Sequence, residues 1–158
     1  MCYSLIGHPY DGDPCRIDGI DRSIVKKMIT RMLSCENKPT AIGSIKKEFK
    51  DLSKDKIIEI VSIIEEKHSV IKNKFFYKNN SAKLMNFESS ILTEILDESI
   101  FKRGIFVLPF HDAVLTTFED AHEVMNIMKN SYIKIVMNYL SKNRIELKSE
   151  INQIIKYK

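Results

Sequence analysis

The most informative part of the sequence is the segment GIFVLPFHDAVLTTFEDAHEVMNIMKNSY, residues 104–132. Two short runs rich in β-branched and aromatic residues flank His111 and Asp112 in this segment. Such runs on either side of two turn residues predict an antiparallel hairpin of about residues 105–117. The apolar residues that follow recur at helical spacing, which predicts a helix over about 118–142.

Most of the chain before this hairpin has a helical pattern. Gly and Pro residues in the first 20 positions are typical of loop, and Asp21 stands where a helix N-cap belongs. A helical period then predicts helices at about 22–33, 40–52, 53–71 and 84–103, and the run FFY at 75–77 predicts a short strand. We therefore predict an α+β fold, mainly helical, in which the hairpin packs against amphipathic helices. A chain of 158 residues suits one domain over 1–158, with a loop-like segment at 1–20, a core at 21–141 and a C-terminal extension at 142–158.

Composition excludes several classes of protein. No apolar run approaches the roughly 18–20 residues that span a bilayer, and the N-terminus lacks a signal-peptide pattern. The three cysteines contain no CxxC spacing, which argues against a disulfide framework or a structural zinc site. We expect a cytoplasmic protein in a reducing interior, with no membrane partner.

Two basic segments are candidate binding sites for nucleic acid. Residues 67–83 hold five lysines and no acid, so phosphate contact and base stacking are expected from Lys72, Lys74, Phe75, Tyr77 and Lys78. A solvated loop whose aromatic rings cap the core is the alternative for this segment. Arg22 and Lys26 are four residues apart on one predicted helix, which suits the phosphates of a nucleotide. An ordinary solvated basic helix is the alternative there.

The tip of the predicted hairpin is the candidate catalytic site. A carboxylate at a tight turn is held at the surface, where it can ligate Mg²⁺, so Asp112 is the candidate metal ligand and His111 its neighbour in the site. The alternative is an ordinary turn with an exposed Asp and a partly buried His.

These segments resemble a known family in the same order along the chain. GIDRSIVKKMITRMLS, residues 19–34, resembles the fingers-helix motif B of family A DNA polymerases and single-subunit phage-type RNA polymerases, and LPFHDAVLTTFEDAHEVMNIM, residues 108–128, resembles their motif C. The resemblance implies that Arg22 and Lys26 bind the phosphates of an incoming nucleotide. It also implies that Asp112 binds catalytic Mg²⁺ and that His111 lies near the primer terminus.

The sequence departs from this family at three places. Ser34 and Cys35 stand where the family has Tyr-Gly, and Ala113 stands where the DNA polymerases have a second carboxylate. The upstream strand that bears the motif A carboxylate is also missing; Asp11 and Asp13 lie in the loop-like segment. Two-metal phosphoryl transfer needs at least two carboxylates. We therefore expect a polymerase-like fragment that binds nucleotide or nucleic acid and is inactive alone, with a second chain supplying the rest of the site.

Three other classes of function remain open from the residues. A metal-dependent phosphohydrolase would need His68 and Asp120 to join the His-Asp pair at 111–112. A nucleophile pair would join Cys35 to His111. A non-catalytic basic helical module would bind nucleic acid or protein without turning anything over.

Overall fold

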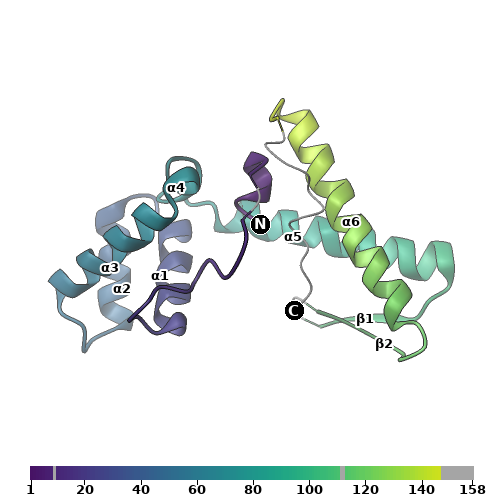
Figure 1. The fold of residues 1–158 in the computed structure, drawn as a ribbon, viewed down its shortest axis with the longest axis horizontal. Coiled ribbons are helices and arrows are strands. Elements are labelled where there is room, and N and C mark those ends of the chain that lie inside the picture. The colour runs from purple at the N-terminus through teal and green to yellow at the C-terminus, as the bar shows by residue number, and fades with distance from the viewer. Residues whose placement is uncertain (9, 111–112, 147–158) are drawn as a thin grey trace. The chain divides into compact units, whose positions relative to one another are not determined.

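The computed structural model describes residues 1–8, 10–110 and 113–146. Its helices and strands are η1 (Ser4–Ile6), α1 (Arg22–Ser34), α2 (Lys38–Glu48), α3 (Lys54–Lys67), α4 (Ser69–Phe75), α5 (Ser81–Leu96), η2 (Asp97–Lys102), β1 (Val107–Phe110), β2 (Ala113–Thr116) and α6 (Ala121–Lys142). The fold is therefore α+β and mainly helical, with one antiparallel hairpin, as the sequence predicts (Figure 1). None of the described helices combines the length and the apolar composition that crossing a bilayer requires.

The contacts within the chain divide it into two compact units. The sequence predicts one domain over 1–158. Unit 1 comprises residues 1–3 and 10–84. Unit 2 comprises the other described residues, 4–8 and those from 85 onward. Each unit is described below by itself.

Unit 1 is built from α1 to α4 around a common core. The helices begin at side-chain caps: Asp21, Asn37 and Ser53 each accept a hydrogen bond from a backbone N–H in the first turn of α1, α2 and α3. Pro39 lies in the first turn of α2, where its missing N–H costs no hydrogen bond. The inward faces carry fully buried side chains, among them Val25, Met28, Met32, Ile45, Ile57, Val61 and Ile64.

The predicted strand at 75–77 is wrong. Phe75 ends α4, Phe76 follows it, and Tyr77 lies in the left-handed region at φ 56°. The rings of Phe75 and Phe76 are buried in unit 1. Helical packing of these rings therefore overrides the β propensity of the FFY run.

Unit 2 packs the hairpin against two helices. β1 pairs with β2 in the register Val107↔Thr116, Leu108↔Leu115, Pro109↔Val114 and Phe110↔Ala113. Val107 and Val114 point into a cluster formed with Ile95 of α5 and with Val124 and Ile127 of α6. Figure 1 shows α5 and α6 on the same side of the hairpin. The sheet face that carries Val107 and Val114 is thus packed against these two helices.

The helix before the hairpin changes its winding. α5 ends at Leu96 and continues as the π-helical turn η2, which stops before Gly104 at φ 67°. Arg103 Nη1 donates to Glu123 Oε1 at 2.9 Å and ties this turn to the start of α6. The sequence predicts one helix at 84–103. This prediction gives the approximate extent of α5 and η2 together, but it misses the change from α-helical to π-helical winding.

Candidate nucleic-acid interface

The exposed side of α1 is basic. We define the basic α1 face as Arg22, Lys26, Lys27 and Arg31; all four residues are exposed, and α1 contains no acidic residue. The opposite side of the helix is fixed by Val25, Met28 and Met32, which are fully buried. The core therefore holds these cations on the solvent side of unit 1.

A shallow surface hollow lies on this face. It is lined by Ser23, Lys26, Lys27, Thr30 and Arg31 of α1 and by Glu48 at the end of α2. The hydroxyl groups are already oriented: Thr30 Oγ1 donates to Lys26 O at 3.0 Å, and the Ser23 hydroxyl donates to Asp21. Three cations around one hollow favour an anionic ligand.

Glu48 neutralises part of this charge. Its Oε1 lies 3.4 Å from Lys27 Nζ, and its Oε2 accepts from Arg31 Nε at 3.0 Å. The hydrogen bond from Arg31, supported by Lys27, lowers the pKa of the Glu48 carboxyl. Lys26 has no carboxylate within ion-pair distance among the described residues, which makes it the cation of the hollow best able to take a phosphate.

Arg22 is held by the N-terminal segment. Its Nε donates to Asp13 Oδ2, and this bond raises the pKa of the guanidinium. The other carboxylate oxygen of Asp13 accepts from the backbone N–H of Cys15 at 2.9 Å. Arg22 and Lys26 thus share an exposed helix face, as their spacing predicts, but Arg22 already has a carboxylate partner.

Two of the predicted contact residues have an internal role. Glu65 is nearly buried, and its Oε2 accepts from Lys72 Nζ at 2.8 Å while its Oε1 accepts from the Tyr77 hydroxyl at 2.7 Å. Lys38 Nζ lies 3.0 Å from the same Oε1. These donors hold the pKa of Glu65 below its usual value against the opposing effect of burial, while burial and the Glu65 bond raise the pKa of Tyr77. Lys72 and Tyr77 therefore stabilise unit 1.

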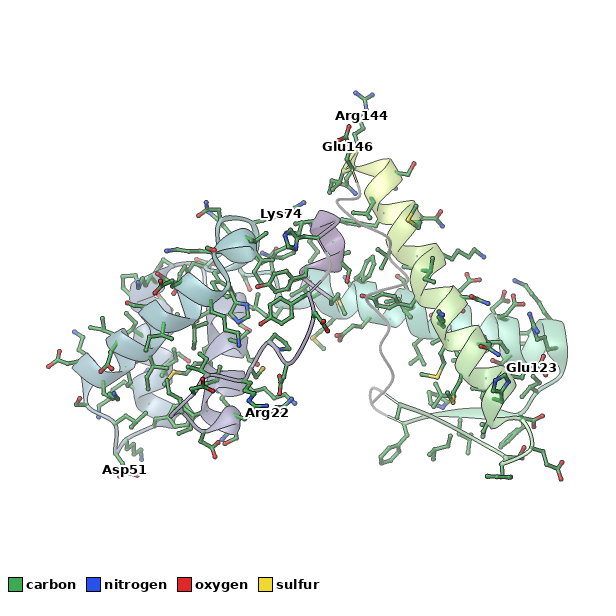
Figure 2. The ribbon with its side chains drawn as sticks, in the orientation of Figure 1. Arg22, Asp51, Lys74, Glu123, Arg144 and Glu146 are labelled. Carbon is green, nitrogen blue, oxygen red and sulfur yellow. The ribbon has the colours of Figure 1, made fainter. Side chains whose placement is uncertain are left out.

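The remaining residues of the basic aromatic segment differ in exposure. Phe75 is buried, so in this conformation it presents no ring face on which a base could stack. Lys74 and Lys78 are exposed. Partial desolvation of Lys74 nonetheless lowers its pKa, and the neighbouring charge of Lys83 adds to the effect. Figure 2 shows Lys74 and Arg22 at opposite sides of unit 1, so the structure does not bring the two basic segments together.

The catalytic candidates lie elsewhere or outside the described part of the chain. His111 and Asp112, and with them the predicted metal site, lie outside the described residues. Over residues 1–8, 10–110 and 113–146, no three His, Cys, Asp or Glu side chains gather as metal ligands would.

His68 and Asp120 have structural partners. His68 Nε2 donates to Pro14 O at 3.0 Å, since a carbonyl can only accept, and its Nδ1 accepts from the Tyr3 hydroxyl at 2.7 Å. Asp120 precedes α6, and its Oδ2 accepts from Thr117 Oγ1 at 2.7 Å.

Comparisons with family models, curated proteins and solved structures found no match to this chain.

Proposed function

We propose that this chain binds the phosphate groups of nucleic acid or of a nucleotide through the basic α1 face, as a polymerase-like fragment that does not transfer nucleotides alone. The observation that carries the proposal is the hollow on α1, where Lys26, Lys27 and Arg31 meet with two hydroxyl groups. Phosphate contacts of this kind supply most non-specific affinity for nucleic acids. The order of the motif B-like and motif C-like segments adds the polymerase context.

Lys26 is the residue whose removal tests the proposal. The experiment is fluorescence anisotropy of labelled single-stranded DNA and RNA with the full chain at several salt concentrations. We expect Lys26→Gln to weaken binding and to reduce the log–log salt slope by about 0.7, the value for one phosphate contact to a single strand. The matched control is Lys54→Gln, because Lys54 is an exposed lysine of unit 1 outside the hollow.

Two results would count against this interface. Binding that is independent of salt, or equal effects of Lys26→Gln and Lys54→Gln, would remove the basic α1 face from the proposal. A large loss in the double variant Lys74→Gln/Lys78→Gln, with no loss in Lys26→Gln, would move the interface to the second basic segment.

A nucleoside triphosphate titration separates the two forms of the proposed ligand. Competition of the labelled strand by triphosphate, lost in Lys26→Gln, supports a nucleotide site on α1. Binding of strands without any competition by triphosphate supports the alternative, a non-catalytic nucleic-acid-binding module.

A further inference from the structure

The basic α1 face is contacted by a carboxylate from the loop before the helix. Asp13 lies in this loop, residues 10–20, and its Oδ2 accepts a hydrogen bond from Arg22 Nε at the start of α1. The Arg22 side chain is 58% exposed and the Asp13 side chain is 17% exposed. The first cation of the face is therefore open to solvent and already paired.

Other hydrogen bonds hold this loop in place. Lys67 Nζ, at the end of α3, donates to Asp13 O at 3.4 Å, and His68 Nε2 donates to Pro14 O at 3.0 Å. The second carboxylate oxygen of Asp13, Oδ1, accepts from the backbone N–H of Cys15 at 2.9 Å. None of these bonds uses the oxygen that receives the guanidinium. That oxygen can therefore be exchanged for another acceptor while the loop stays in place.

The pair between Arg22 and Asp13 is of the kind that a phosphate can replace. A guanidinium binds carboxylate and phosphate oxygens with the same N–H donors, and both bonds are charge-assisted. Exposed ion pairs contribute little to stability, because water and salt screen them. Arg22 is the exposed member of this pair, so a phosphate oxygen that reaches its guanidinium can compete with the carboxylate.

The other carboxylate of the basic α1 face is held differently. Glu48 ends α2, a helix whose Ala41 and Ile45 are buried in the core of unit 1. Glu48 also pairs with two cations at once, Lys27 and Arg31. Asp13 instead lies in a loop, so it is the carboxylate of this face that a ligand displaces more readily.

We propose that Asp13 is an internal competitor for the phosphate that Arg22 binds. In the free protein the Asp13 carboxylate occupies the guanidinium, and in the complex a phosphate of the bound strand takes its place. Asp13 thus lowers the affinity of the basic α1 face for nucleic acid. This inference rests on the proposed function, because it concerns the ligand of the same face.

Asp13→Asn tests the competition. The change removes the charge but keeps Oδ1, so the hydrogen bond from the backbone N–H of Cys15 is retained. The probe is a fluorescently labelled single-stranded DNA, titrated with the full chain at one salt concentration. We expect the dissociation constant to fall about two- to fivefold, which is the range set by the small contribution of an exposed ion pair.

Two further variants show whether this gain comes from Arg22. Asp18→Asn removes the same charge at an exposed position of the same loop, and its dissociation constant should stay close to that of the wild type. Asp13→Asn/Arg22→Gln should lose the whole gain, because the released guanidinium is absent. Circular dichroism shows whether each variant remains folded.

NMR of the wild type gives a readout that needs no variant. The Nε–H resonance of Arg22 should shift when the strand is saturating, because a phosphate replaces the carboxylate as its acceptor. The Nε–H resonance of Arg103 is the internal control. Arg103 donates to Glu98 Oε1 at 3.2 Å and is not part of the basic α1 face, so its resonance should stay in place.

The outcomes separate this inference from the function on which it rests. Strand binding that does not depend on Lys26 would remove the proposed function and this inference with it. Three results would overturn the role of Asp13 alone while binding still depends on Lys26: equal affinities of Asp13→Asn and Asp18→Asn, a double variant that keeps the gain, or an Arg22 resonance that does not move at saturation.

Discussion

Glu65 has three hydrogen-bonding or ionic partners inside unit 1. Its carboxylate accepts hydrogen bonds from Lys72 Nζ and from the Tyr77 hydroxyl, and it pairs with Lys38 Nζ, at distances of 2.7–3.0 Å. Removing the carboxylate leaves the part-buried Tyr77 hydroxyl and two partly exposed lysines without their acceptor, which costs stability. We expect Glu65→Ala to lower the free energy of unfolding by about 1.5–3 kcal/mol, measured by urea denaturation. Glu66→Ala, at an exposed neighbouring position, should change it by less than about 0.5 kcal/mol; equal losses would refute the role of the cluster.

His68 makes stability depend on pH. Burial lowers its pKa in the folded protein below the usual 6.5. The unfolded chain therefore takes up a proton first as the pH falls, so the stability due to neutral His68 is complete above pH 6.5 and is lost as the pH falls through the folded pKa. We expect the urea midpoint to decrease between pH 7.5 and 5.5, with a smaller decrease in His68→Gln. His122→Gln, at an exposed position on α6, should keep the wild-type slope; a flat wild-type profile would contradict this assignment.

Sequence patterns predict the apolar side chains better than the polar ones. Ile57, Val61 and Ile64 follow the 3.6-residue repeat of α3, and all three are buried in the core. Glu65 follows this stripe directly beside Glu66, so the local sequence does not show which of the two acids is buried. Its partners come from α2 and from the basic aromatic segment at 67–83, so no local pattern identifies them. For the same reason the sequence predicts Lys72 and Tyr77 as surface contacts to nucleic acid.

At the scale of elements, side-chain caps fix where helices begin. Ser53 Oγ accepts from the N–H of Lys56 at 3.1 Å at the start of α3. We expect Ser53→Ala to lower the free energy of unfolding by about 1 kcal/mol, the usual value of an N-cap. Ser62→Ala is the control, since the Ser62 hydroxyl only donates to the carbonyl of Ile58 within the same helix. A loss in Ser62→Ala as large as that in Ser53→Ala would show that capping is not the cause.

Element type is well predicted wherever the pattern is long. The hairpin, the helix after it and the N-cap Asp21 are all confirmed. The start of α6 shifts from 118 to Ala121, because Thr117 and Asp120 form a hydrogen-bonded turn before it. The short run at 75–77 fails because a three-residue aromatic pattern fits a strand or a buried helix end equally well.

At the scale of the whole molecule, the sequence limits what catalysis is expected. At the motif C-like His-Asp pair the sequence offers one carboxylate, Asp112, with Ala113 beside it. A lone carboxylate holds Mg²⁺ weakly, because the ion keeps most of its waters. Two metals cannot be bridged by it, so the charge that develops on a transferring phosphoryl group lacks its main stabilisation.

We therefore expect the full 158-residue chain to bind nucleic acid without extending a primer. The assay is template-directed incorporation with Mg²⁺ or Mn²⁺, comparing the wild type with Asp112→Ala. Loss of one well-placed electrostatic group usually costs ~10²–10³ in rate, and here a whole metal ligand is missing, so both proteins should give only background. Incorporation that Asp112→Ala abolishes would contradict this expectation and would require a second carboxylate. Asp11, Asp13 and Glu88 are then the positions to substitute, because Asp11 and Asp13 precede the motif B-like segment and Glu88 lies on α5, the helix before the hairpin.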